Sequence, residues 1–256
     1  MKKLYLACLI AAFSLSTQAA TILYQQNFEN PVGFVNEGGD INITRTVNQL
    51  YGNQPAGFLF AQPFTTETLL VGGNQAFGVG YKDPQNVAGS YVVAMLSSAQ
   101  NDLLALSFNV GTNQFLNFKL DISSIDLDRF GGPFVPAGGL APIFRISLYD
   151  NPGGGVGLGS GAPLSFVDIT GTATAFKNIF DWTNHTVALD ASGATNGNVI
   201  LQIDELQGGY AAFDNFVIAA SDTPGDVGNG TVPEPASMVL LALGLVGLGL
   251  ARRKKA

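Results

Sequence analysis

Hydrophobic and polar residues alternate in short runs over most of the chain. In residues 144–150, Phe144, Ile146 and Leu148 alternate with more polar neighbours, and Gly, Pro, Asn and Asp separate one run from the next. This period of two is typical of strands with one buried face. Runs of this kind are ILYQQNF, SYVVAML, LLALSFNV, QFLNFKLDI, FRISLYD, LSFVDIT, HTVALD, NVILQI and AAFDNFVIA. Outside the two ends no stretch keeps a helical period, so the pattern predicts an all-β fold, an antiparallel β-sandwich.

The first 20 residues have a different pattern. Lys2 and Lys3 precede an apolar stretch, and small residues follow around Ala19. This order is typical of a secretory signal peptide, a short N-terminal helix that directs export through the Sec machinery and is then removed. Cys8 is the only cysteine and lies in this segment, so we expect an exported chain without disulfides or thiol chemistry.

The C-terminal end is also apolar. Residues 236–251 carry no charge over 16 positions, and as a helix they would extend roughly 24 Å, against a hydrocarbon core of about 30 Å. The length alone would also suit a buried core helix. The terminal position, the lack of a polar stripe and a basic cluster directly after the run favour a single transmembrane-type helix, with the cluster on the cytoplasmic side. The cluster consists of Arg252, Arg253, Lys254 and Lys255.

A short motif precedes this apolar run, namely Pro233, Glu234 and Pro235. Motif, apolar run and basic cluster, together with the signal peptide, resemble the PEP-CTERM proteins of Gram-negative bacteria, the proposed substrates of exosortase. The resemblance implies export across the inner membrane, transient anchoring, processing near the motif, and delivery to the cell surface or to an exopolysaccharide matrix. It implies nothing about the activity of the exported domain.

Removal of the two ends changes the net charge. Six of the 12 Lys and Arg residues lie in those ends. The exported part therefore has six basic and 19 acidic residues and a net charge of −13, compared with −7 for the whole chain. Such a surface repels nucleic acid and attracts divalent cations. We therefore expect four parts: a signal peptide (1–20), a β-sandwich (21–220), a polar linker (221–231) and a sorting segment (232–256).

Residues 180–219 contain a Trp, an alternating strand, a Gly-containing turn, a second strand, a Gly-Gly loop and a last strand that opens on Phe-Asp-Asn-Phe. This order resembles the C-terminal half of galactose-binding-like jelly rolls, the fold of many carbohydrate-binding modules. Where that fold holds a structural calcium ion, ligands often come from the end of the first strand and the start of the last, positions that match Glu29 and Asp214. The alternative is that both are ordinary carboxylates at strand ends.

Three aromatic residues are candidates for carbohydrate contact. Trp182 lies in a polar segment with Asp181 and Asn184, and a Trp face can stack on the apolar side of a sugar ring; in the jelly-roll pattern, however, a Trp at this place packs in the core. Phe130 and Phe134 lie in a loop rich in Gly and Pro, and loops of sandwiches often carry function.

Catalytic signatures are weak in this sequence. One histidine excludes a multi-histidine zinc site, there is no Gly-x-Ser-x-Gly motif, and no motif singles out a pair of carboxylates. The sequence therefore predicts a non-catalytic surface or matrix protein that binds polysaccharide. The alternatives are a structural matrix protein without a specific ligand and, third, a two-carboxylate glycoside hydrolase.

Overall fold

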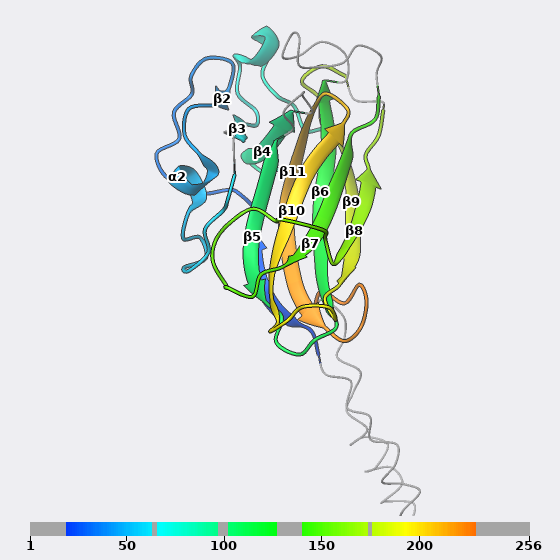
Figure 1. Ribbon diagram of the computed structural model, residues 1–256. Helices are drawn as coiled ribbons and strands as arrows, with labels where there is room; N and C mark the ends of the chain where they lie inside the picture. Colours follow the sequence, from blue (N-terminus) through cyan, green and yellow to red (C-terminus); the bar gives the residue numbers. More distant parts are fainter. Residues whose placement is uncertain (1–18, 63–65, 97–101, 127–139, 174–175, 229–256) are drawn as a thin grey trace, which may run out of the picture. The chain divides into compact units, whose positions relative to one another are not determined.

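The structure is a computed structural model that describes residues 19–62, 66–96, 102–126, 140–173 and 176–228. Almost all of its regular elements are strands (Figure 1). In chain order they are β1 (Thr21–Gln26), β2 (Ile41–Asn42), α2 (Val47–Tyr51), β3 (Glu67–Leu70), the 3₁₀ turn η1 (Ala76–Gly78), β4 (Tyr91–Leu96), β5 (Leu103–Asn109), β6 (Phe115–Asp126), β7 (Ile143–Asp150), β8 (Ser165–Thr170), β9 (Asp181–Asp190), β10 (Asn198–Gln207) and β11 (Tyr210–Ser221).

The strands form two antiparallel sheets that lie face to face (Figure 1). The seven-stranded sheet has the order β2-β3-β4-β11-β6-β9, with β1 also paired to β11. The four-stranded sheet has the order β5-β10-β7-β8. The predicted all-β antiparallel sandwich is therefore confirmed, and each of the nine alternating runs lies in or overlaps a strand.

The main core fills the space between the sheets. In β10 the side chains of Val199, Leu201 and Ile203 point inward and are almost fully buried, as the alternation predicts. Aromatic rings from the larger sheet complete this core, for example Phe213 and Phe216, whose centroids lie 5.1 Å apart. Burial of such side chains is the main force that holds two sheets together.

A second core lies on the outer face of the seven-stranded sheet. Because neighbouring residues of a strand point to opposite faces, Val93 of β4 joins the main core while Val92 joins this second cluster. Residues 71–90 cover it, together with Phe180 and Trp182. This covering segment is important below, because several of its residues line a surface pocket.

The predicted signal helix and transmembrane-type helix lie outside the described residues. Within the described part of the chain, no helix has the length and apolar character needed to cross a membrane. Residues 20–227 form one compact unit. The end of the compact unit is tied down by Asn117, which donates hydrogen bonds to the carbonyls of Thr223 (3.1 Å) and Asp226 (2.9 Å).

Candidate functional site at the junction of the first and last strands

A β-bulge interrupts the last strand at Asn215. In the pairing of β11 with β6, Asp214 faces Asp121 and Val217 faces Lys119, so two residues of β11 oppose one residue of β6. Asn215 adopts φ 55°, a left-handed conformation that Asn tolerates better than most residues. Bulges of this kind re-aim side chains at functional sites, and here the bulge presents the Asn215 amide on the outer face of the sheet.

The Asn215 side chain takes part in a polar row across three strands. Its Nδ2 donates to Oδ2 of Asp121 at 3.0 Å and to the carbonyl of Val87 at 3.2 Å. From the other side, Nδ2 of Asn184 donates to Oδ1 of Asp121 at 2.6 Å. The Asp121 carboxylate is therefore held between two amides, and the row fixes the orientation of both.

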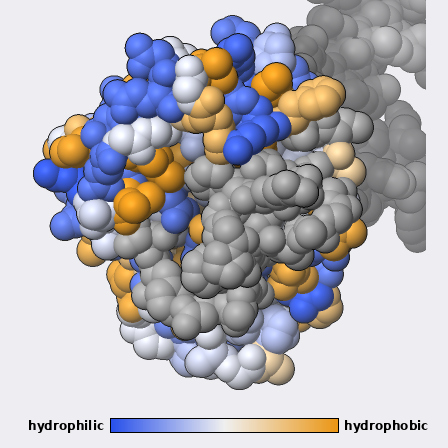
Figure 2. All heavy atoms as spheres, turned by 90° about the horizontal axis from the view of Figure 1, so that it is seen from above, coloured by the Kyte–Doolittle hydropathy of each residue, from blue (hydrophilic) through white to orange (hydrophobic). Residues whose placement is uncertain are grey.

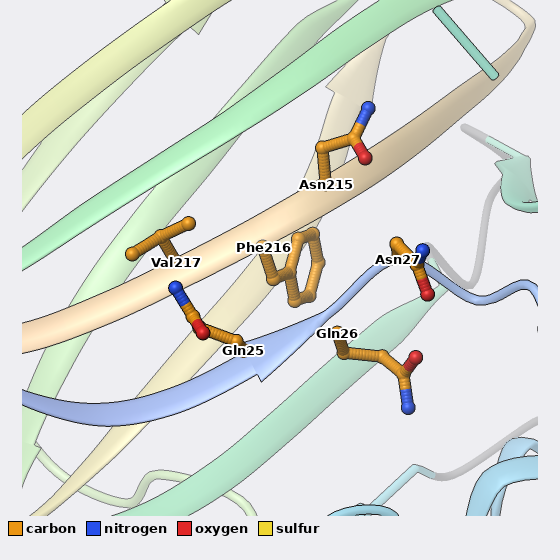
Figure 3. Close-up of a pocket in the computed structure, with 6 residues that line it drawn as sticks. All are labelled: Gln25, Gln26, Asn27, Asn215, Phe216 and Val217. Carbon is orange, nitrogen blue, oxygen red and sulfur yellow. The ribbon is translucent and has the colours of Figure 1, made fainter. Parts of the chain in front are cut away.

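Beside this row lies a surface pocket of about 330 Å³ between β1 and β11 (Figure 3). Its lining residues are Gln25, Gln26, Asn27, Asn215, Phe216 and Val217. Gln26 is directed inward: it donates to the carbonyl of Gln54 at 3.0 Å and accepts from the N–H of Phe28 at 2.8 Å. The exposed amides of Gln25 and Asn27 remain to face a ligand, whereas the Asn215 amide already donates to Asp121 and to the carbonyl of Val87.

Glu29 ties the end of the first strand to the start of β4. Its carboxylate accepts hydrogen bonds from the N–H of Ser90 at 3.0 and 2.9 Å, and from the N–H of Tyr91 at 3.4 Å. Gly89 lies directly against it with φ +58°, and a Cβ at this position would be 2.1 Å from Oε1 of Glu29. The contact therefore requires glycine at position 89 for both conformation and space.

Asp214 is buried at the centre of the junction, with an exposed fraction of 1%. Its Oδ1 accepts a hydrogen bond from the N–H of Asn215 at 2.6 Å. The pKa of Asp214 is raised to about 9, chiefly by burial, with smaller contributions from the charges of Glu29, Asp121 and Asp83. Glu29 and Asp214 are the two predicted calcium ligands, and the charge of Glu29 acts on the buried Asp214.

These residues fit a cation in part. A cation would relieve the cost of ionising the buried Asp214, and the carboxylate of Glu29 keeps acceptor capacity beyond its backbone hydrogen bonds. In the described part of the chain, however, no set of three or more Asp, Glu, His or Cys side chains is arranged to hold a metal ion. Amide and backbone oxygens would have to supply the rest of the six to eight ligands that Ca²⁺ requires.

The aromatic candidates lie elsewhere. Trp182 is 6% exposed and packs against Phe180 with ring centroids 5.1 Å apart, so it is part of the second core. Phe130 and Phe134 lie outside the described residues, as do Pro233, Glu234, Pro235 and the basic cluster from Arg252 to Lys255. Of the site described here, sequence reasoning missed the amides of Gln25 and Asn27. The signal for Asn215 was its place in Phe-Asp-Asn-Phe, where Asn is one of the few residues that can form such a bulge.

Comparison with known proteins identifies the tail. Residues 231–255 match the PEP-CTERM protein-sorting motif, which confirms the resemblance of this segment. A search of curated proteins found no match.

Solved structures with a related arrangement of strands are distant. The C-terminal family 22 carbohydrate-binding module of Clostridium thermocellum Xyn10B shows 14% identity, coverage of 80% of this chain and 98% of the module, and a TM-score of 0.40. A cyclase from Fischerella sp. TAU shows 16% identity, coverage of 80% and 100%, and a TM-score of 0.43. The adhesin domain K3 of Lys-gingipain from Porphyromonas gingivalis W83 shows 12% identity, coverage of 78% and 99%, and a TM-score of 0.40. At these identities and TM-scores the similarities say nothing about the chemistry of a site in this chain.

Proposed function

We propose that this protein is an exported surface protein whose β-sandwich binds polysaccharide without modifying it. The observation that carries the proposal is the open pocket between β1 and β11 with its exposed amides. Sugar hydroxyls both donate and accept hydrogen bonds, and an amide side chain offers both functions at fixed geometry. Uncharged groups also lose less hydration energy than ions when a ligand covers them.

The surroundings of the pocket support binding over catalysis. None of the six residues that line it is acidic. The nearby acidic residues have other roles: Glu29 accepts backbone hydrogen bonds, Asp121 is held between two amides, and Asp214 is buried. A two-carboxylate hydrolase needs both groups at the bound sugar, so this arrangement favours a binding module.

The face of the domain that Figure 2 shows also favours a polar ligand. Viewed from above, hydrophobic side chains form small patches between hydrophilic ones (Figure 2). A large continuous apolar patch would instead point to a protein partner.

The sorting motif supports the proposal that this binding takes place outside the cell membrane. We propose that the Sec machinery exports the chain, that the C-terminal segment holds it transiently in the inner membrane of a Gram-negative cell, and that an exosortase-type enzyme processes it near Pro233–Pro235. The released domain then resides at the cell surface or in an exopolysaccharide matrix. A calcium ion at Glu29 and Asp214 is part of the proposal as a structural ion, and it would join the first strand to the last.

Affinity electrophoresis tests the binding proposal. The chain of residues 21–231 contains nearly the whole compact unit of residues 20–227, and its migration is compared in gels with and without soluble polysaccharides, including exopolysaccharide from the producing cells. We expect retardation in at least one gel, and a roughly tenfold weaker interaction for the double variant Gln25→Ala/Asn27→Ala, since each lost hydrogen bond contributes about 0.5–1.5 kcal/mol. Asn74→Ala, an exposed amide outside the pocket, serves as the matched control.

Two outcomes would contradict the proposal. If no polysaccharide retards the protein, a structural matrix protein without a specific ligand becomes the better account. If the bound polysaccharide releases reducing ends during incubation, the protein is a hydrolase.

A further inference from the structure

A second surface pocket, of about 480 Å³, is lined largely by the segment that covers the outer face of the large sheet. Its lining residues are Val71, Gly72, Tyr81, Lys82, Asp83, Pro84, Asn86, Gly89 and Ile179. Hydrophobic residues form much of this lining, and two exposed polar side chains, Lys82 and Asn86, accompany them. An apolar surface with a few convergent polar groups is the usual composition of a small-ligand site.

The backbone around Lys82 is held firmly on both sides. Tyr81 accepts a hydrogen bond from the N–H of Gly72 at 2.9 Å, and Lys82 exchanges two with the neighbouring segment, to the carbonyl of Asn178 and from the N–H of Phe180, both at 2.9 Å. Lys82 and Ile179 also form a parallel bridge. The position from which the Lys82 ammonium extends is therefore fixed by the fold.

The Lys82 charge is not neutralised by an ion pair with any described residue. The adjacent carboxylate, Asp83, is occupied by the backbone: it accepts from the N–H of Gln85 at 3.0 Å, of Val87 at 2.6 Å and of Ala88 at 2.7 Å. Two other described cations, Arg145 and Lys177, have partners. Arg145 forms an ion pair with Asp168 at 2.7 Å, and Nζ of Lys177 lies 4.2 Å from the ring centroid of Phe77. Lys82 is thus a cation that remains available at the edge of a pocket.

We propose that this pocket binds an acidic sugar unit, a uronate within a polysaccharide, with its carboxylate on the Lys82 ammonium. The apolar face of the ring would lie against Val71 and Ile179, and the Asn86 amide would reach a hydroxyl. The exported chain carries a net charge of −13, which repels an anionic polymer, so recognition requires a local cation such as this one. The inference rests on the proposed polysaccharide binding and names the class of polymer that the protein selects.

The experiment compares polygalacturonate with its carboxyl-reduced product, which has the same backbone and no charge. Binding to residues 21–231 is measured by affinity electrophoresis at physiological ionic strength with a chelator present, so that no divalent cation bridges protein and polymer. Lys82→Gln removes the charge and keeps much of the side-chain length. Arg45→Gln, an exposed cation that lines neither pocket, makes the same change in net charge.

We expect the acidic polymer to bind more tightly than the reduced polymer, and Lys82→Gln to weaken its binding about tenfold, the effect of one hydrogen bond between charged groups. Arg45→Gln should bind as the unaltered protein does. Equal binding of the two polymers, or equal effects of the two variants, would overturn the inference and leave the proposed function intact. Failure of the protein to bind these two polymers, while it still binds others, would also overturn the inference. Failure with every polysaccharide would overturn the proposed function and the inference together.

Discussion

The carboxylate of Glu29 accepts the backbone N–H of Ser90 at 3.0 and 2.9 Å, and through this contact the end of the first strand holds the start of β4. Both strands pair with β11, β4 along Tyr210–Phe213 and β1 along Phe216–Ala220. The Glu29–Ser90 contact therefore closes the gap that the two strands leave beside the bulge. This gap is where the amide pocket and the buried Asp214 are located.

The close packing of Glu29 on Gly89 gives the first prediction. Gly89→Ala introduces a Cβ at φ +58° and 2.1 Å from Oε1 of Glu29, so it should lower the free energy of unfolding through both backbone strain and steric overlap. Gly111→Ala isolates the backbone part, because Gly111 has φ +62° and no atom within 4 Å of the added Cβ. We expect Gly89→Ala to cost about 1–3 kcal/mol more than Gly111→Ala, measured by urea unfolding.

A second substitution separates the two causes. In a Glu29→Ala background the overlap disappears, so the costs of Gly89→Ala and Gly111→Ala should become similar. Glu29→Ala alone should lower the free energy of unfolding by about 1 kcal/mol, because Ser90 is exposed and its backbone N–H can form a hydrogen bond with water instead. If Gly89→Ala and Gly111→Ala have equal effects in the unaltered protein, the carboxylate does not pack as the structure places it.

The strands could be predicted because each buries one face, and this leaves a period of two in the sequence. The same alternation in β10 directs Val199, Leu201, Ile203 and also Glu205 inward, and Glu205 has no exposed surface. A polar residue in an alternating run normally predicts an outward position, so the sequence pattern does not reveal this buried acid. Only the structure shows that the alternation of inward-pointing side chains continues to the charged residue Glu205.

The arrangement around the bulge could be predicted only in part. Glu29 and Asp214 were expected near each other because the jelly-roll resemblance joins the first strand to the last. The turn of Asn215 into the left-handed region, and the pairing of its amide with Asp121, depend on β6, which is far away in the sequence. Local pattern contains no information on such contacts. The short elements β2, α2 and β3 were missed because they are too short to show a period.

The sorting segment gives the second prediction. In a host with an exosortase, we expect surface-associated protein to lack Arg252–Lys255 and most of the apolar run, as seen by mass spectrometry of its C-terminal peptide. A variant in which Glu234 is replaced by Ala should retain the ARRKKA end, because the motif that the processing enzyme reads is altered. An intact end on the unaltered surface protein would instead favour a permanent membrane anchor.

Buried acids at one end of the sandwich give the third prediction. Burial raises the pKa of Glu67 to about 8, with a further contribution from Asp102. Burial also raises the pKa of Glu205 well above its usual value, and among the residues that the structure describes neither of its carboxylate oxygens has a hydrogen-bond partner. Both groups are neutral in the folded protein at low pH and must ionise against their surroundings as the pH rises.

The sign of the effect follows from these shifts. A raised pKa in the folded state means that the stability is fully present below about pH 4.5 and is lost as the pH rises through about 8. We expect the free energy of unfolding to fall between pH 5 and pH 8, and Glu67→Gln to reduce that slope. Glu37→Gln is the control, because Glu37 is exposed and the hydroxyl of Thr44 lowers its pKa. A slope that is the same in both variants would show that Glu67 is ionised at neutral pH in the folded protein.

Calcium at the strand junction gives the last prediction. An ion bound only by the folded state stabilises it by about 2.7 kcal/mol at a hundredfold excess over Kd. Millimolar Ca²⁺ should therefore raise the Tm of residues 21–231 more than Na⁺ at matched ionic strength, which separates specific binding from screening of the acidic surface. The buried Asp214, with a pKa of about 9, must lose its proton to bind the ion. The calcium response should accordingly grow from pH 6 to pH 9.

Asp214→Asn keeps the shape of the side chain and removes its charge, so it should abolish the calcium-specific part of the response and leave the screening part. Asp190→Asn, which removes an exposed carboxylate outside both pockets, should keep the full response. Glu29→Gln should weaken the response, because it removes the second charge at the junction. If Ca²⁺ raises the Tm of Asp214→Asn and Glu29→Gln as much as that of the unaltered protein, the two carboxylates do not bind it, and their proximity serves the packing of the strands alone.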